Sequence, residues 1–133
     1  MTDCLLMGDS IAVGLFGALH ASGLLCALGA RIGATSGELP SQIAHAGFHP
    51  LVILSAGSND TTGAPLEANL FAARKALSGA HVIWVLPYKR RAAYAVTQIA
   101  FRFGDDLVDL AAFPTHDRIH PSNYRAVADA LPR

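Results

Sequence analysis

The chain alternates between short runs in which almost every residue is apolar and longer stretches in which apolar residues recur at helical spacing. The apolar runs are typical of strands buried on both faces of a sheet, and they predict strands at residues 4–8, 24–28, 51–54, 81–86 and 107–110. The other stretches predict helices at residues 10–21, 39–46, 65–78, 92–103 and 122–131. Strands that alternate with helices form parallel sheets with right-handed crossovers. We therefore expect an α/β protein, a three-layer α/β/α sandwich around a central parallel sheet.

Three residues with polar side chains or exposed backbone follow the first three predicted strands. Ser10 comes just after the first, Gly33 lies in the loop after the second, and Asn59 lies in the loop after the third. We expect the flavodoxin-like strand order 2-1-3-4-5. In such sheets ligands bind beyond the carboxyl ends of the strands, near the switch in strand order. The pattern therefore predicts that these residues meet at one edge of the sheet.

Length and charge limit the classes of function. With 133 residues, the chain is expected to form one domain over residues 1–133. Lys and Arg together number ten, as do Asp and Glu, so net charge does not favour binding to nucleic acid or to a membrane surface. The composition is 52% hydrophobic, which indicates a compact core and is compatible with a homodimer.

The two cysteines and the first residues bear on the cellular compartment. Cys4 and Cys26 each lie inside an apolar run, where a cysteine usually packs as a small hydrophobic residue, so we expect them to be unbonded. The chain does not begin with a signal-peptide pattern, and no apolar run approaches the ~18 to 20 residues of a membrane span. The expected location is cytoplasmic, without a membrane partner, and delivery outside the cell by another route stays open.

Ser10 is the candidate nucleophile. It stands between a buried strand and a helix, where a hydroxyl can project from the edge of the sheet. A serine hydroxyl is a weak nucleophile until a base takes its proton. The structural alternative is a helix N-cap, a common role for a serine at this place.

His120 and Asp117 are the candidate base and its orienting acid. A histidine can accept the serine proton near neutral pH and return it to the leaving group. The aspartate stands three residues earlier, so one turn of chain would bring its carboxylate to the imidazole. Pro121 disfavours helical geometry at His120, which favours a histidine held on a loop. The alternative is an exposed aspartate that caps a turn.

Asn59 and Gly33 are candidates for an oxyanion hole. The amide of Asn59 can donate a hydrogen bond to a tetrahedral intermediate, and Gly33 can offer a backbone N–H without a Cβ in the way. With the N–H of Ser10 they would supply three donors. Gly29 and Gly37 are alternatives to Gly33, and both candidates could instead be ordinary turn residues.

These pieces resemble the SGNH (GDSL-type) hydrolases, in the order that this family shows. The matching blocks are Gly8-Asp9-Ser10, Gly33, Gly57-Ser58-Asn59-Asp60 and Asp117-Arg118-Ile119-His120, and together they span nearly the whole chain. The resemblance implies the SGNH hydrolase fold, with a catalytic triad of Ser10, Asp117 and His120 and an oxyanion hole of Ser10, Gly33 and Asn59. Arg118 departs from the family, where a small residue is more usual.

The expected function is a serine ester hydrolase that needs no metal or organic cofactor. A short chain without lid insertions predicts an open site for short acyl groups. The first substrate class to consider is a small-molecule or carbohydrate ester, such as O-acetyl groups on a cell-wall glycan.

Two other functions stay open at this point. A non-catalytic binding or structural module could use the same fold. A metal-dependent hydrolase is a weaker alternative, because His116, Asp117 and His120 are closely spaced, and so are His45 and His49, but neither group is a recognised zinc pattern. Residues 89–91 (Lys-Arg-Arg) follow the fourth predicted strand; they suggest a solvated loop or a site that attracts an anion.

Overall fold

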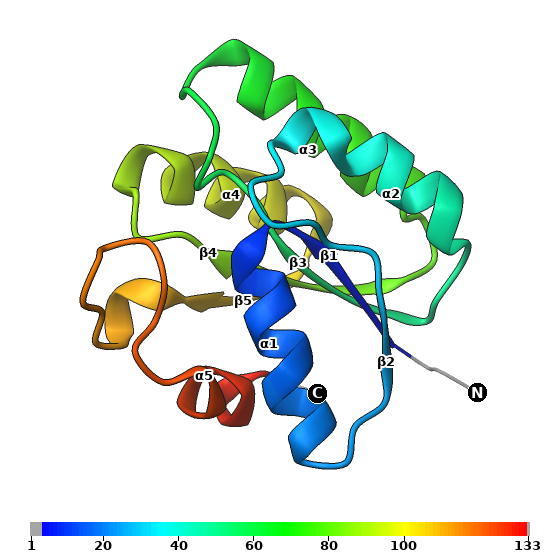
Figure 1. The fold of residues 1–133 in the computed structure, drawn as a ribbon. Coiled ribbons are helices and arrows are strands. Elements are labelled where there is room, and N and C mark those ends of the chain that lie inside the picture. The colour runs from blue at the N-terminus through cyan, green and yellow to red at the C-terminus, as the bar shows by residue number, and fades with distance from the viewer. Residues whose placement is uncertain (1–3, 133) are drawn as a thin grey trace.

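The computed structural model describes residues 4–132, and these form a five-stranded parallel sheet in the order β2-β1-β3-β4-β5 (Figure 1). The strands are β1 (Cys4–Gly8), β2 (Cys26–Leu28), β3 (Leu51–Ser55), β4 (His81–Leu86) and β5 (Asp106–Asp109). The α-helices are α1 (Ser10–Ala21), α2 (Leu39–Ala46), α3 (Ala64–Ala76), α4 (Arg90–Phe103) and α5 (Tyr124–Ala130). Short 3₁₀ turns occupy Ser36–Glu38 and Leu110–Ala112. The predicted fold class and strand order are confirmed.

Helices cover both faces of the sheet and create two hydrophobic cores. Helices α1 and α5 pack on one face, and α2, α3 and α4 pack on the other (Figure 1). Successive residues of the central strands alternate between the two cores, because side chains of a strand point to opposite faces. In β4, for example, Ile83 and Val85 join the α1/α5 core while Val82 and Trp84 join the other.

The element boundaries differ from the predicted ones by only a few residues. Strand β2 begins at Cys26 rather than at residue 24, because residues 22–25 are held in the turn that leaves α1. Helix α5 begins at Tyr124 rather than at residue 122, because the side chain of Asn123 caps it by accepting a hydrogen bond from the Ala126 N–H at 3.2 Å.

The expectation of two unbonded cysteines is wrong. Cys4 and Cys26 form a disulfide, with 4.7 Å between their Cα atoms. The reason is the register of the sheet, because the two residues are direct partners on the neighbouring strands β1 and β2. Each cysteine by itself fits an apolar strand, and only strand pairing places the two sulfur atoms together.

Candidate active site

The chain turn between β1 and α1 positions Ser10. Gly8 ends the strand with a φ of 112°, and a Cβ at this residue would lie 1.7 Å from the carbonyl oxygen of Ser55 on β3. Only glycine therefore fits here. The following Asp9 caps the helix, because its carboxylate accepts a hydrogen bond from the Ile11 N–H at 3.1 Å. Ser10 is thus the first residue of α1 and not its N-cap, and its hydroxyl is available for other partners.

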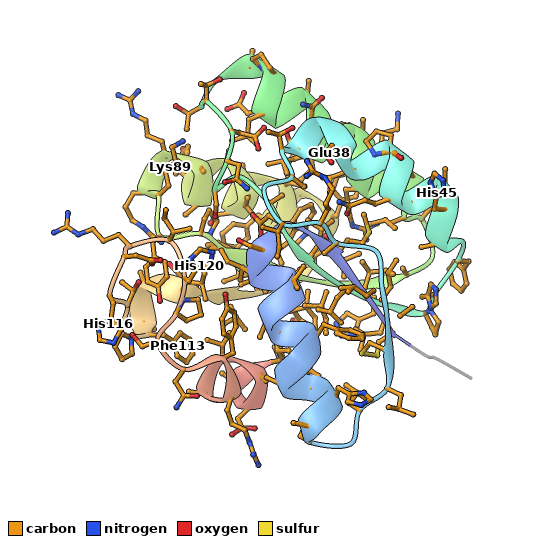
Figure 2. All side chains as sticks on the ribbon, in the orientation of Figure 1. Glu38, His45, Lys89, Phe113, His116 and His120 are labelled. Carbon is orange, nitrogen blue, oxygen red and sulfur yellow. A yellow bond between two sulfur atoms is a disulfide. The ribbon has the colours of Figure 1, made fainter. Side chains whose placement is uncertain are left out.

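Ser10, His120 and Asp117 form a continuous chain of hydrogen-bonding distances. The Ser10 Oγ lies 2.8 Å from the His120 Nε2, and the Asp117 Oδ2 lies 2.9 Å from the His120 Nδ1. Figure 2 shows His120 beside the first turn of α1, although the two residues are 110 positions apart in the sequence. The structure therefore brings together the three residues that the sequence selected for a triad.

The loop before α5 holds His120 in place with its own backbone. The Asp117 Oδ1 accepts hydrogen bonds from the backbone N–H groups of Ile119, at 2.9 Å, and His120, at 2.8 Å. The Thr115 hydroxyl donates to the His120 carbonyl at 2.6 Å, and a β-bridge joins Thr115 to Pro121. One aspartate thus orders the turn and contacts the imidazole, which fixes the direction of the ring.

Hydrogen bonding and burial shift the pKa values of two carboxyl groups here in opposite directions. The backbone and side-chain hydrogen bonds from His120, with that from the Ile119 N–H, hold the pKa of Asp117 well below its usual range, so this group is ionised at neutral pH. Burial raises the pKa of Asp9 to about 6, against the lowering effect of its hydrogen bonds. Asp117 therefore keeps its negative charge next to the imidazole over the whole neutral and mildly acidic range, whereas Asp9 becomes protonated as the pH falls through about 6.

Asn59 contacts the loop that carries Gly33. The Asn59 Nδ2 donates to the carbonyl oxygen of Ala34 at 2.9 Å, which leaves its second N–H to face another acceptor. The loop that carries Gly33 is tied to the end of β1, because the Arg31 N–H donates to the Gly8 carbonyl at 3.0 Å. Within residues 4–132 the Ser10 N–H has no hydrogen-bond partner, as expected for the first turn of a helix.

The structure also distinguishes among the candidate glycines. The N–H of Gly29 donates to the Leu6 carbonyl at 2.8 Å, so it serves the sheet and not a ligand. Gly37 lies in the 3₁₀ turn at Ser36–Glu38, beyond the loop. Gly33 adopts a φ of 83° next to the partner of Asn59, which makes it the best placed of the three.

Several supporting residues were not found from the sequence. Gln42, on α2, clamps both backbone groups of Gly8, with its side-chain oxygen 2.7 Å from the N–H and its amide nitrogen 2.9 Å from the carbonyl. The Asp60 carboxylate accepts hydrogen bonds from the N–H of Ser36, at 2.9 Å, and from its hydroxyl. A buried glutamine on a short helix was the available signal, but its partner is 34 residues away.

In the described part of the chain, the structure does not support a metal site at His116, and it shows a contact for one of the basic residues at 89–91. Figure 2 shows His116 at the outside of the loop, and the Asp117 carboxylate is hydrogen-bonded to His120 instead. Among residues 4–132, no three His, Cys, Asp or Glu side chains are close enough together to hold a metal ion. Of the three basic residues at 89–91, Arg90 pairs with Asp109 at 2.9 Å and begins α4, so the run is not simply a solvated loop.

The arrangement can activate a hydroxyl and stabilise an anion. When the imidazole donates its Nδ1–H to the ionised Asp117 carboxylate, its Nε2 is the atom that can accept the proton of the Ser10 hydroxyl. The Ser10 N–H, which is free of a partner among residues 4–132, could donate a hydrogen bond to the oxygen of a carbonyl under attack by Ser10.

Comparison with known proteins gives likenesses of fold alone. No protein-family model and no curated protein sequence matches the chain. One solved crystal structure has a TM-score of 0.68 at 14% sequence identity, with 98% of this chain and 94% of that chain covered. Another is the C-terminal catalytic domain of Streptococcus pneumoniae peptidoglycan O-acetyltransferase A (OatA) with a methylsulfonyl adduct; its TM-score is 0.63 at 19% identity, with 96% and 86% covered. This chain has the fold of that domain. The α/β/α sandwich around a central parallel sheet is therefore an architecture that this chain shares with that domain.

Proposed function

We propose that the protein is a serine ester hydrolase that cleaves short-chain acyl esters through Ser10, His120 and Asp117. The observation that carries the proposal is the unbroken chain from the Ser10 Oγ to the His120 Nε2 and from the Nδ1 to the Asp117 Oδ2. A structural N-cap role does not require such a chain, and Asp9 already fills that role.

The reaction proceeds in two halves. His120 takes the proton of Ser10 as the serine oxygen bonds to the ester carbonyl, and the resulting oxyanion receives hydrogen bonds from the Ser10 N–H, the Gly33 N–H and the Asn59 amide. The protonated imidazole, stabilised by ionised Asp117, then gives its proton to the departing alcohol. In the second half His120 activates a water molecule, which releases the acyl group as an acid and regenerates Ser10.

The proposed substrates are acetyl and other short acyl esters, with O-acetyl groups on a carbohydrate or cell-wall glycan as the first class to test. The likeness to the catalytic domain of a peptidoglycan O-acetyltransferase supports this choice. The same likeness favours a second candidate, transfer of the acyl group from Ser10 to a sugar hydroxyl instead of water. Both reactions share the acyl-serine step and differ only in the acceptor.

The disulfide favours an oxidising compartment over the cytoplasm that the sequence suggested. Disulfides persist mainly outside the reducing cytosol, and Cys4 and Cys26 are bonded in the sheet. Within residues 4–132, no helix has both the length and the apolar character needed to cross a membrane. An oxidising setting is also where a cell-wall glycan is encountered.

The deciding experiment measures hydrolysis of p-nitrophenyl esters from acetyl to octanoyl, with and without a chelator. We expect chelator-resistant activity with the acetyl ester, and a loss of at least about 1000-fold in kcat for Ser10→Ala, since removal of one triad member disables the others. Asn59→Ala should lower kcat by about 100- to 1000-fold through the loss of one oxyanion donor. Adding a glycan acceptor tests transfer by the appearance of acetylated sugar.

Ser78→Ala, a change of the same size at an exposed position, is the matched control and should keep full activity. Circular dichroism and urea unfolding check that each variant folds. Full activity in well-folded Ser10→Ala, or activity abolished by the chelator, would contradict the serine mechanism. A folded wild type that is inactive on esters and on acetylated glycans would favour the non-catalytic binding module.

A further inference from the structure

A pocket of about 370 Å³ adjoins the proposed triad at the carboxyl edge of the sheet. Its walls come from the loop after β3, from the segment between β4 and α4, and from the loop before α5: Ser58, Tyr88, Lys89, Arg118 and Ile119. Arg118 and Ile119 stand between Asp117 and His120 in the sequence, and Ser58 directly precedes Asn59. A group in this pocket would therefore lie next to a substrate held at Ser10.

Arg118 occupies a backbone conformation that a long side chain rarely adopts. Its φ is 62°, the only positive value among the non-glycine residues from 4 to 132. A left-handed residue other than glycine costs roughly 1 kcal/mol or more, and such positions concentrate at functional sites. The turn is held by the Arg118 N–H, which donates to the Thr115 Oγ1 at 3.0 Å. The exposed guanidinium has no hydrogen bond or ion pair within the described chain, so its charge is available at the pocket.

Lys89 supplies the second cation. Its Nζ donates a hydrogen bond to the backbone carbonyl of Asp60, which places the ammonium against the loop that carries Asn59. Figure 2 shows Lys89 and His120 on the same side of the molecule, where β4 ends. An ammonium has three donors, so two remain for a ligand.

The carboxylates nearby are engaged elsewhere and do not pair with these two cations in the part of the chain that the structure describes. Asp60 accepts from Ser36, Asp117 accepts from His120, and Asp109 pairs with Arg90. The Ser58 hydroxyl in the pocket wall is buried and lacks a hydrogen-bond partner among residues 4–132. The pocket thus brings two positive charges together, in a molecule whose net charge is zero.

We propose that this pocket binds an anionic group on the alcohol part of the ester substrate, a carboxylate or a phosphate held by Lys89 and Arg118. The inference rests on the proposed function and deepens it. The alcohol side is assigned because His120 returns its proton to the departing alcohol oxygen, so that oxygen lies against the imidazole and the rest of the alcohol faces Arg118 and Ile119. The side chains of Tyr88 and Ile119 provide apolar walls for the part of the alcohol that carries the anionic group.

The test compares 4-acetoxybenzoate, which carries a carboxylate on its alcohol part, with the neutral 4-acetoxybenzamide. We expect Arg118→Asn and Lys89→Met each to lower the ratio of kcat/KM for the anionic ester to that for the neutral ester by about 3- to 10-fold, the size of a partly exposed charged hydrogen bond. Asparagine suits the left-handed backbone at position 118 better than other side chains do. The preference should also shrink at high salt. 4-Acetoxyphenyl phosphate distinguishes a phosphate site from a carboxylate site.

Lys75→Met removes one positive charge on α3, away from the pocket, and is the matched control; it should leave the ratio unchanged. An equal drop in Lys75→Met, or an unchanged ratio in Arg118→Asn and Lys89→Met, would overturn the anion subsite while ester hydrolysis stands.

A binding experiment tests the pocket without turnover. It adds 4-hydroxybenzoate or 4-hydroxybenzamide and follows the NMR shifts of the backbone amides of Ser58, Lys89 and Ile119. If the protein binds the carboxylate selectively, and Arg118→Asn weakens this binding, the subsite is supported even when no ester is cleaved. In that case only the proposed hydrolase activity is contradicted. Equal binding of both ligands contradicts the subsite.

Discussion

At the scale of single residues, the neighbour of Ser10 in the sequence, Asp9, is a buried carboxyl group. Its side chain is fully buried, its Oδ1 caps α1, and its Oδ2 has no hydrogen-bond partner among the described residues. Burial penalises the ionised form and raises the pKa of Asp9 from 3.8 to about 6. The helix cap that frees Ser10 for other contacts therefore costs stability once Asp9 is ionised.

The raised pKa of Asp9 predicts that the free energy of unfolding depends on pH. The folded state holds this proton more tightly than the unfolded state does, so the stabilisation is present below about pH 4 and is lost as the pH rises through about 6. The loss in the free energy of unfolding is about 3 kcal/mol, since one pKa unit corresponds to roughly 1.4 kcal/mol. Asp117 acts in the opposite sense, but its effect falls below pH 4 and outside this window.

Asp9→Asn keeps a capping oxygen and removes the ionisation. We expect it to match the wild type near pH 4 and to be more stable by about 1 to 3 kcal/mol at pH 7 to 8, as measured by urea unfolding across this range. Asp129→Asn, on the exposed surface of α5, is the control for the loss of a carboxylate. A difference between Asp9→Asn and wild type that stays constant from pH 4 to 8 would contradict the assignment.

At the scale of elements, the packing of α1 against α5 supports the loop that carries His120. Gly14 faces the ring of Tyr124, the first residue of α5, so closely that a Cβ at Gly14 would lie 2.3 Å from the ring. Tyr124 follows His120 by only four residues. The small residue therefore lets the two helices approach, and this approach fixes where the loop enters α5.

The two glycines of α1 provide a matched pair of alanine substitutions. Gly14→Ala should lower the free energy of unfolding by about 1 to 3 kcal/mol through overpacking against Tyr124, and it should also lower kcat on the acetyl ester. Gly17→Ala meets no atom within 4 Å and should raise the free energy of unfolding by about 0.5 to 1 kcal/mol, through better helix propensity. Urea unfolding measures both, and equal effects of the two changes would refute the role of the contact.

At the scale of the whole molecule, one sheet joins the two cores. Strands β1, β3 and β4 contribute side chains to both, and the buried ion pair of Arg74 with Asp105, at 2.7 Å, links α3 to the turn before β5. The disulfide fastens β2 to β1 across 22 positions of sequence. With both cores built on shared strands, neither can unfold without exposing the other.

We therefore predict one cooperative unfolding transition for residues 1–133, seen at the same urea concentration by fluorescence of Trp84 and by far-ultraviolet circular dichroism. A reductant present during unfolding should lower the free energy of unfolding by about 3 kcal/mol, the loop-entropy value for a bridge of this length. The double variant Cys4→Ala/Cys26→Ala should not respond to reductant. Two separate transitions would contradict the single domain.

The local pattern of residues was enough to predict most of the fold. Apolar runs bounded by glycine and proline predicted each strand to within two or three residues, because burial on both faces leaves a local signature. Where boundaries moved, a contact with a neighbouring residue decided them, as the side chain of Asn123 did at the start of α5.

The sequence by itself determined the α/β architecture, the strand order expected of it, and the candidates Ser10, Gly33, Asn59, Asp117 and His120, because residue types and their order along the chain carry this information. Only the tertiary structure decided which distant segments touch: the disulfide between strand partners, the hydrogen bonds of Gln42 to Gly8, the hydrogen bond of the Gly29 N–H to Leu6, and the pocket lined by Lys89 and Arg118. Each of these is a contact between segments far apart in the sequence. The spacing of apolar residues along the chain does not encode such contacts, because they form only when the strands pair in register and the helices pack on the sheet.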